Sequence, residues 1–204
     1  MLLVLGTHNR KKGQELIDLF APLGFACKTL ADFPDALDVE ESGKTFAENA
    51  RLKACGQARH LGCWMLGEDS GLAVDALEGA PGVYSARFSG AGATDESNNR
   101  LLIEKLGDLP LERRAAHYVA HAVLADPRGN VRGESSGRCD GRIRFEPAGS
   151  GGFGYDPYFE IIEYHHTFAE LGNVVKSAIS HRARAIRALV PQMLRCVEDG
   201  RWIE

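Results

Sequence analysis

The sequence predicts an α/β protein with a mixed β-sheet, and two observations support this class. In the first half of the 204-residue chain, short apolar runs typical of buried strands alternate with segments that have the apolar spacing of helices. In the second half, two long strand-like segments are joined by the turn sequence DPRGN, which predicts an antiparallel hairpin. The length is typical of one domain, or of one domain with two lobes, and we expect residues 1–204 to form a single domain.

The first half begins with a strand and a helix. The run MLLVL predicts a buried strand that ends at Gly6, and a second strand is expected around residues 25–30. Gly24 is expected to end the helix between them. The apolar face of that helix is predicted to consist of Leu16, Leu19, Phe20 and Leu23.

Capping residues place the next helix and strand. Thr45 with Glu48 three residues later forms a capping box, which predicts a helix that runs to about Leu61. The run CWMLGED then predicts an apolar strand that ends in a loop.

The second half contains a helix, the hairpin and a final helix. Thr94 is expected to cap a helix that ends near Gly107, and the hairpin covers residues 114–138. Ser180 is expected to begin the last helix, whose apolar stripe extends from Ile186 to Val197.

Composition excludes several classes of protein. The net charge of −4 argues against general binding to nucleic acid or to acidic membrane surfaces. The chain has no apolar run long enough to span a bilayer, and its first residues lack the order of a secretory signal. The five cysteines form no CxxC pair, which predicts reduced thiols in the cytoplasm and no zinc finger.

The motif GTHNRKK lies where the first strand gives way to the first helix. A helix N-terminus has free backbone N–H groups and the positive end of the helix dipole, so this position is suited to phosphate. The P-loop pattern is absent. The alternative is an ordinary capped helix start exposed to solvent. The candidate phosphate-binding residues are Thr7, His8, Asn9, Arg10, Lys11 and Lys12.

Two further motifs carry carboxylates. In EESGKTFAENARLKA, Glu40 and Glu41 precede a helix on which Asn49 and Lys53 share one face. Carboxylates near a lysine suit a Mg²⁺ ion beside a phosphate, although a surface charge patch is the commoner arrangement.

In GEDSGLAVDAL, Glu68 and Asp69 are expected at the carboxyl end of an apolar strand, where ligands of α/β proteins usually bind. Either carboxylate would serve as a Mg²⁺ ligand or as a general base. The alternative is an acidic Asx turn.

The last two motifs are GSGGFGYDP and KSAISHRARA. Four glycines around Phe153 indicate either a turn with a buried aromatic ring or a close approach of the backbone to a ligand. His181 and Arg182 follow Ser180 in the first helical turn, where cations oppose the helix dipole. Either both side chains point into solvent or they have a functional partner, and we favour a partner.

Taken together and in this order, the motifs resemble the inosine triphosphate pyrophosphatase family, hydrolases of the non-standard purine nucleotides ITP, dITP and XTP. The resemblance covers nearly the whole chain. It implies a twisted mixed sheet with flanking helices and two lobes around a nucleotide cleft, a homodimer, and a cytoplasmic enzyme. It also implies that water attacks the α-phosphorus with the help of Mg²⁺ and yields a monophosphate and pyrophosphate.

The resemblance also implies roles for individual residues. Asp69 would be the general base or a metal ligand, with Glu40 in the metal site. Glu41 and Glu68 remain alternatives for the second ligand. The residues from Thr7 to Lys12 would hold the triphosphate, and we expect Lys53 to add positive charge there. The nucleoside pocket would consist of Ser70, Phe153, Gly154, Tyr155, Asp156, Lys176, His181 and Arg182.

Within that pocket, we expect Phe153 to stack on the purine while the glycines let the backbone lie flat against the base. Backbone N–H groups near Phe153, with His181 and Arg182, would donate to the 6-keto oxygen of hypoxanthine or xanthine. Adenine has an amino donor at that position and would leave the site's donors unpaired. The sequence does not explain how guanine is rejected.

Two other functions compete with this reading. One is a nucleotide-binding regulator without turnover, which the adjacent acids Glu68 and Asp69 disfavour because carboxylates repel phosphate in the absence of a metal. The other is a related hydrolase of pyrimidine triphosphates, which only the resemblance disfavours.

Overall fold

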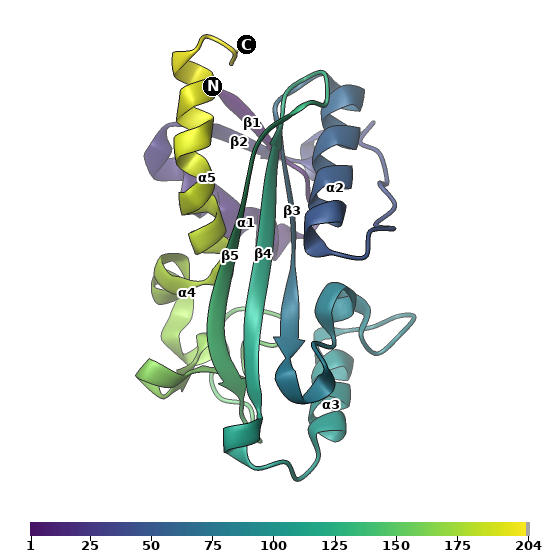
Figure 1. The fold of residues 1–204 in the computed structure, drawn as a ribbon, viewed down its shortest axis with the longest axis vertical. Coiled ribbons are helices and arrows are strands. Elements are labelled where there is room, and N and C mark those ends of the chain that lie inside the picture. The colour runs from purple at the N-terminus through teal and green to yellow at the C-terminus, as the bar shows by residue number, and fades with distance from the viewer. Residues whose placement is uncertain (203–204) are drawn as a thin grey trace. The chain divides into compact units, whose positions relative to one another are not determined.

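The computed structural model describes residues 1–202, and within them seven strands form one mixed sheet (Figure 1). The strand order is β2-β1-β3-β4-β5-β6-β7. β1 pairs in parallel with β2 and β3, whereas β6 pairs antiparallel with β5 and β7. The predicted mixed α/β class is therefore confirmed. The strands are β1 (Leu2–Leu5), β2 (Ala26–Thr29), β3 (Met65–Val74), β4 (Ala115–Ala125), β5 (Val131–Ile143), β6 (Phe159–Ile161) and β7 (His166–Thr167).

Five α-helices accompany the sheet in the described residues: α1 (Arg10–Phe20), α2 (Phe46–Leu61), α3 (Asp95–Leu106), α4 (Phe168–Ile179) and α5 (His181–Glu198). The predicted starts are confirmed for α2 and α3, whose N-caps Thr45 and Thr94 accept hydrogen bonds from the backbone of Glu48 and Ser97. α5 begins directly after Ser180, as expected. None of the described helices has the length and apolar character needed to cross a bilayer.

The chain divides into two compact units. Unit 1 comprises Met1–Asp69, Ala120–Gly137 and the segment from Arg182 onward, and unit 2 comprises Ser70–Val119 and Arg138–His181. The long strands β3, β4 and β5 each contribute residues to both units.

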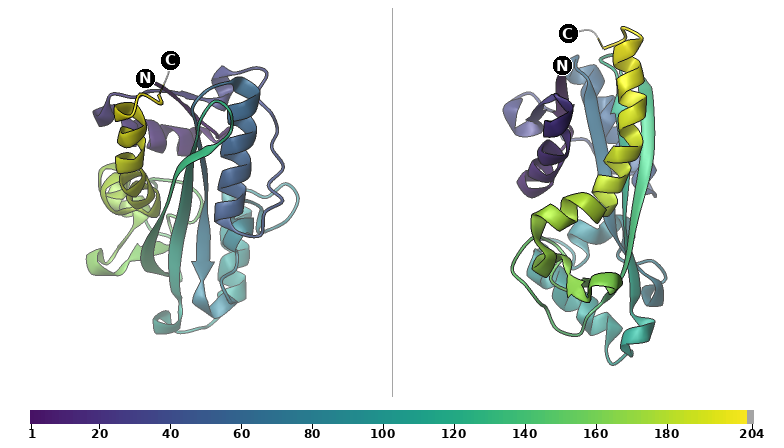
Figure 2. Two further views of the ribbon diagram at one scale, coloured as in Figure 1. Left: turned by 45° about the horizontal axis from the view of Figure 1, so that its top comes forward. Right: turned by 90° about the vertical axis from the view of Figure 1, so that its left-hand side faces the viewer.

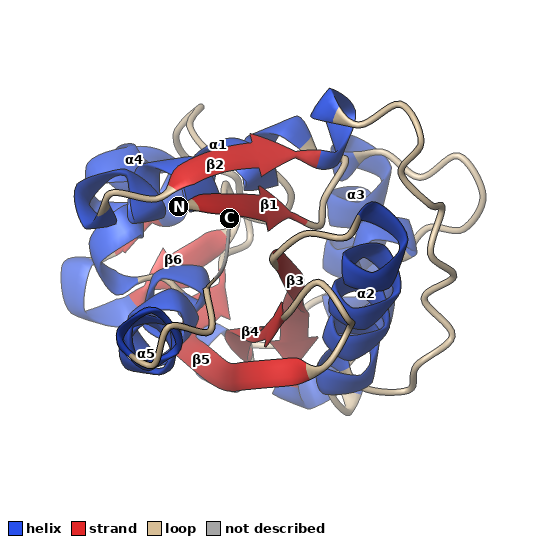
Figure 3. Cartoon of the chain, turned by 90° about the horizontal axis from the view of Figure 1, so that it is seen from above, coloured by secondary structure: helices blue, strands red, loops and turns tan. Residues whose placement is uncertain are grey.

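Unit 1 has apolar cores on both faces of its strands. On one face, Leu3 and Leu5 of β1 pack with helices α1 and α5; on the other, Val4 packs with the alanines of α2. Successive strand residues point to opposite faces, so an uninterrupted apolar strand is buried on both sides. The two helices α2 and α5 run alongside the strands in Figure 2, and Figure 3 shows the same elements from above.

Unit 2 has a single core on which α3 and α4 pack. Its largest buried side chains include Phe159 of β6, Phe168 of α4 and Leu102 of α3, and the two phenylalanine rings pack against the ring of Tyr118. α4 was not predicted. Gly172, which has a non-helical φ of 73°, kinks the helix between its two halves.

Strand β3 differs from the prediction. It does not end at the acids but continues through them to Val74, so the Asx-turn alternative is wrong. Ser70 and Gly71 resemble turn residues, yet Leu72 and Val74 beyond them are buried in unit 2 and extend the strand. The helix after β1 also ends early, at Phe20, and Leu23 lies in a 3₁₀ turn where its side chain is exposed.

Candidate active site

The buried carboxylate of Asp69 is the centre of a charged cluster in unit 1. β1 pairs with β3 only as far as Leu5 and Leu66, so Asp69 lies beyond the end of β1. Its Oδ1 accepts a hydrogen bond from Lys53 Nζ at 2.9 Å, and its Oδ2 accepts one from Asn49 Nδ2 at 3.2 Å. Both donors come from α2, so this helix orients the carboxylate.

Gly67 explains why α2 lies so close to β3. A Cβ on Gly67 would lie 2.6 Å from the backbone nitrogen of Ala54, closer than real side chains come. A glycine at this position lets the helix and strand backbones approach directly. The close packing brings Asn49 and Lys53 within hydrogen-bond distance of Asp69.

Burial makes Asp69 a stronger base than an exposed aspartate. Removal from water raises its pKa, and the positive charges of Lys53 and Lys12 offset only part of that effect. The nearby carboxylate of Glu41 acts in the same direction as burial. A base with a raised pKa accepts a proton from water more readily.

The neighbouring Glu68 has the opposite properties. Adjacent strand residues point to opposite faces, and Glu68 faces α1 and α5 instead of α2. Its carboxylate lies 2.8 Å from Lys12 Nζ and 3.3 Å from Arg182 Nη2, and Arg182 also binds Glu15. Burial alone would raise the pKa of Glu68, but the charges of Arg182, Lys12 and Lys53 outweigh it and hold this pKa well below its usual range.

These contacts explain the cation at the start of α5. The guanidinium of Arg182 is buried, and its partners in unit 1 are the carboxylates of Glu68 and Glu15. Arg182 therefore does not point into solvent, which excludes that alternative for this cation. Glu68 is occupied by two cations, so the structure favours Glu41 over Glu68 as the second carboxylate beside Asp69.

The acidic loop before α2 is tied to that helix at two points. The side chain of Gln57 bonds both backbone groups of Leu37, at 3.1 and 2.6 Å. Nearer to the helix, the backbone N–H of Gly43 donates to Asn49 Oδ1 at 2.8 Å. The fully buried Asn49 therefore joins the acidic loop to Asp69 through its two amide atoms.

The loop brings one further carboxylate to the cluster. Glu41 lies 3.4 Å from Lys53 Nζ, the same ammonium group that binds Asp69. Glu40 is exposed and has no hydrogen bond or ion pair within residues 1–202. No group of three or more His, Cys, Asp or Glu side chains converges in the described part of the chain. Two carboxylates with water and substrate oxygens still suit Mg²⁺, which is usually held this way, and Asp69 with Glu41 fits that donor set better than Asp69 with Glu40.

The predicted phosphate loop is a capped helix start. Asn9 is the N-cap of α1, and its Oδ1 accepts from the backbone nitrogen of Lys12 at 3.0 Å. The hydroxyl of Thr7 accepts from the backbone nitrogen of Asn9. The side chains of His8, Arg10 and Lys11 are exposed, and the first turn of α1, all of it described, contains no acid. The helix start is therefore electropositive, as phosphate binding requires.

A separate set of contacts surrounds Asp156 in unit 2. This carboxylate is 2% exposed and accepts from the backbone N–H of Phe153 at 2.9 Å and from Lys176 Nζ at 2.5 Å. The hydroxyl of Tyr118 lies 3.4 Å away, and the Tyr118 ring stacks on His181 with ring centroids 4.6 Å apart. Lys176 Nζ lies 4.5 Å from the centroid of the Phe153 ring. Asp156 thereby links the loop to β4 and α4.

The glycines of this loop pack against the protein itself. A Cβ on Gly149 or Gly151 would collide with the backbone of Ala169, and one on Gly152 would collide with the Asp156 carboxylate. Only Gly154, at φ 62°, has open space where a side chain would stand. The structure therefore gives the first three glycines a packing reason within the protein, and the close approach of the loop to a base stays a prediction.

The expected backbone donors are also occupied. The N–H of Phe153 bonds Asp156, and the N–H of Gly154 bonds Asp95 Oδ2 at 2.8 Å. These two amides do not point to a base oxygen, because each already donates to a carboxylate. Tyr155 is a core residue whose hydroxyl donates to the carbonyl of Ser85 at 2.8 Å, and Ser70 is half-buried on β3.

Comparison with known proteins identifies the family. The model of the Ham1 family matches residues 3–192. The chain belongs to the Ham1 family. A protein of Rhodopirellula baltica named dITP/XTP pyrophosphatase is 53% identical over 198 residues, which cover 97% of this chain and 95% of that protein. One of an Exiguobacterium species with the same name is 46% identical over 194 residues, covering 95% of this chain and 97% of that protein.

Solved structures of similar proteins agree with the fold. The Ham1 protein of Staphylococcus aureus has a TM-score of 0.82 at 34% identity, covering 97% of this chain and all of that one. A protein of Mycobacterium abscessus described as nucleoside-triphosphatase / dITP/XTP pyrophosphatase has a TM-score of 0.74 at 41% identity, covering 95% of this chain and all of that one. The family predicted from the motifs is confirmed.

Several residues of this Ham1 family member's site were not predicted. Asn49 was singled out only because it shares a helix face with Lys53. Glu15 and Tyr118 carry no local signal, because their partners lie far away in the sequence. These residues can be recognised only from the contacts that the folded structure shows.

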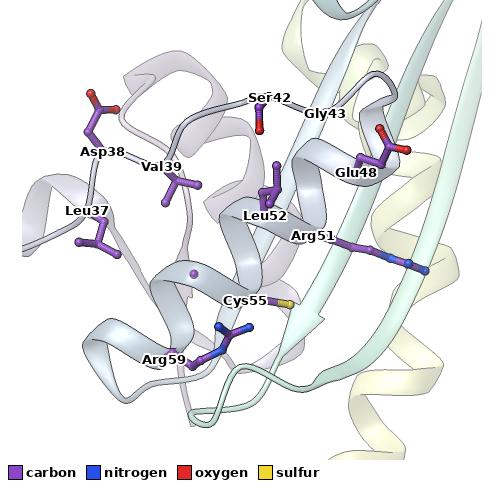
Figure 4. A pocket seen from close by; sticks show the side chains of 11 residues that line it. Leu37, Asp38, Val39, Ser42, Gly43, Glu48, Arg51, Leu52, Cys55 and Arg59 are labelled. Carbon is purple, nitrogen blue, oxygen red and sulfur yellow. The ribbon is translucent and has the colours of Figure 1, made fainter.

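A shallow groove of about 700 Å³ lies on the outer side of α2 (Figure 4). Its lining includes the apolar Leu37, Val39 and Leu52 together with Arg51, but neither Asp69 nor Lys53. Arg51 is bound to Glu134 on β5. The groove is therefore separate from the carboxylate cluster.

Proposed function

We propose that this chain hydrolyses the non-standard purine nucleoside triphosphates ITP, dITP and XTP to the monophosphate and pyrophosphate. The observation that carries the proposal is the buried Asp69, oriented by Lys53 and Asn49 beyond the end of β1. The names of the similar proteins from Rhodopirellula baltica and Exiguobacterium support the substrate class.

The triphosphate would bind at the start of α1. Backbone N–H groups and the helix dipole attract the phosphates, with Arg10 and Lys11 adding charge at the surface. Lys12 and Lys53 lie beside the carboxylates and stabilise the charge that builds up on the departing pyrophosphate.

Asp69 would act on the attacking water. Its raised pKa suits it to take a proton from water as the oxygen attacks the α-phosphorus. The bond from that phosphorus to the bridging oxygen breaks, and pyrophosphate leaves with the electron pair. Lys53 and Asn49 keep the carboxylate in one orientation during this step.

Asp69 and a glutamate of the acidic loop would hold Mg²⁺, with Glu41 better placed than Glu40. A bound Mg²⁺ polarises phosphate oxygens and lowers the pKa of bound water. The protein's contribution is the placement of the two carboxylates by Asn49 and Lys53.

The purine would be recognised in unit 2 around Phe153. The ring stacks on the base, and side chains, with Lys176 and His181 as candidates, replace the expected backbone donors to the 6-keto oxygen. Adenine lacks that acceptor and leaves the donors unpaired. Phe153→Ala is expected to raise the KM for ITP by about tenfold with a smaller effect on kcat, because base stacking contributes about 1–3 kcal/mol. An unchanged KM would remove Phe153 from the base site.

The deciding experiment is an assay with Mg²⁺ against ITP, XTP, GTP, ATP and UTP that detects pyrophosphate and orthophosphate separately. Pyrophosphate from ITP and XTP, with little from ATP and UTP, supports the proposal. Orthophosphate would indicate attack at the γ-phosphorus, and binding without turnover would indicate a regulator. We further propose that the protein is a homodimer and that it acts in the cytoplasm. Sedimentation of the purified protein tests the dimer.

A further inference from the structure

We propose that Asp95 and Asn99, at the start of α3, are positioning residues that set how strictly the base site separates 6-keto from 6-amino purines. The inference rests on the proposed function, because it concerns the same loop around Phe153. It assigns the selectivity of that loop to a helix that contributes no residue to it.

The two side chains hold both backbone groups of Gly154. Asp95 Oδ2 accepts from the Gly154 N–H at 2.8 Å, and Asn99 Nδ2 donates to the Gly154 carbonyl at 2.9 Å. The amide nitrogen of Asn99 also donates to the Asp95 carbonyl at 2.8 Å, which links the two residues within α3. We call Asp95 and Asn99 together the clamp on Gly154.

Gly154 is the residue of the loop that most needs such a clamp. It has a positive φ, and open space surrounds the position of a Cβ. A glycine in open space has the widest choice of conformations. Its neighbours Phe153, Tyr155 and Asp156 have other anchors, which are Asp156, Ser85 and Lys176 respectively.

Asn99 has a polar atom that its structural role does not use. Its side chain is 8% exposed, and its Oδ1 is buried without a hydrogen-bond partner within residues 1–202. An unmatched buried acceptor lowers stability, so an apolar side chain would suit this helix position better if packing were its only role. The amide instead directs its donor at Gly154.

Selectivity follows from the rigidity of the clamp. A site that rejects adenine by leaving donors unpaired works only if neither the ring of Phe153 nor the loop shifts to admit another arrangement. Freeing Gly154 gives the loop that freedom. We therefore expect a larger loss of discrimination between 6-keto and 6-amino purines than of turnover.

The test compares four variants. Asp95→Ala removes the acceptor at an exposed position, so it is expected to fold. Asp95→Asn keeps an acceptor oxygen and is expected to rescue selectivity. Asn99→Asp removes the donor to the Gly154 carbonyl. Arg100→Ala, at an exposed position on the same helix, is the matched control. Thermal unfolding of each variant is measured alongside the assays.

The readouts are the ratio of kcat/KM for ITP to that for ATP, and the ratio of the dissociation constant of AMP to that of IMP, measured by calorimetry. We expect Asp95→Ala and Asn99→Asp to lower both ratios by about tenfold, mainly through KM, because an imprecise site loses about that much discrimination. Asp95→Asn and Arg100→Ala are expected to keep the wild-type ratios.

Unchanged ratios in folded Asp95→Ala and Asn99→Asp proteins would overturn the inference while leaving the proposed function intact. Equal losses for ITP and ATP would do the same, since they indicate a purely structural role. A wild-type protein that neither hydrolyses ITP nor binds IMP would overturn both proposals.

Discussion

Each unit of the molecule contains a buried aspartate paired with a lysine. The two aspartates differ in how much of their capacity to accept hydrogen bonds is still unused. In unit 1, Asp69 accepts hydrogen bonds from two side chains, Asn49 and Lys53. In unit 2, Asp156 accepts from the Phe153 backbone, from Lys176 and from Tyr118. A carboxylate has about four lone-pair sites, so Asp69 keeps capacity for a water proton or a cation, whereas Asp156 is committed to shaping its loop.

A third carboxylate shows that donors and packing, not exposure alone, control the pKa. Asp126 and Asp69 are both 6% exposed. Asp126 lies in the hairpin turn and accepts from the backbone of Arg128, from the backbone and side chain of Asn130, and from Arg132, and these bonds outweigh burial and lower its pKa. Asp69 has fewer donors, so burial prevails and its pKa is raised. A sparsely bonded buried carboxylate is therefore the better marker of chemistry.

The largest effect is expected from Asp69→Asn. The amide cannot take a proton from water, so kcat for ITP is expected to fall by about 10³-fold while the melting temperature changes little. Steady-state kinetics and thermal unfolding measure the two quantities. If the variant retains a large share of wild-type turnover, Asp69 is not the base.

Asp156→Ala is expected to lower stability, in contrast to Asp69→Asn, which lowers kcat and leaves the melting temperature nearly unchanged. It removes the carboxylate of the buried ion pair with Lys176, which costs about 3 kcal/mol of unfolding free energy. Urea unfolding measures this loss. The double variant Asp156→Ala/Lys176→Met is expected to recover part of the stability. If it recovers none, the loss in Asp156→Ala does not come from breaking the pair with Lys176.

Asn49→Leu, compared with a variant that affects only the acidic loop, tests whether Asn49 acts by orienting Asp69. It removes the donor to Asp69 and the acceptor for Gly43, and we expect kcat to fall by about 10- to 100-fold, as for other residues that orient a catalytic group.

Gln57→Leu is the matched control, because Gln57 anchors the same loop at Leu37 without touching Asp69. It is expected to lower stability but to keep most of kcat. Equal losses of kcat in both variants would show that Asn49 acts through the loop alone.

The smallest effect concerns Asp126 and the pH. Because the folded-state pKa of Asp126 is lowered, its contribution to stability is present above its ordinary pKa of 3.8 and is lost as the pH falls towards the lowered value. Asp126→Asn is expected to cost about 1–2 kcal/mol at pH 7 and to flatten the decline of the melting temperature between pH 5 and pH 3. An unchanged acid decline would show that other carboxylates dominate it.

Local patterns in the sequence predicted the elements whose signals lie within a few residues. The capping box at Thr45 and the turn DPRGN placed α2 and the hairpin, because caps and turns are satisfied by neighbouring residues. The same patterns failed at Ser70 and Gly71, where turn-like residues lie inside β3 because burial of Leu72 and Val74 extends the strand.

By itself the sequence determined the fold class, the Ham1 family and the candidate site residues from Thr7 to Arg182, because motifs and their order are properties of the chain. The tertiary structure alone decided how those residues are used. It directed Glu68 and Asp69 to opposite faces of β3, packed Gly149 and Gly151 against Ala169, and brought Asn99 to Gly154. Each of these contacts joins residues that are distant in the sequence or depends on the path of a strand, and no local pattern encodes such a contact.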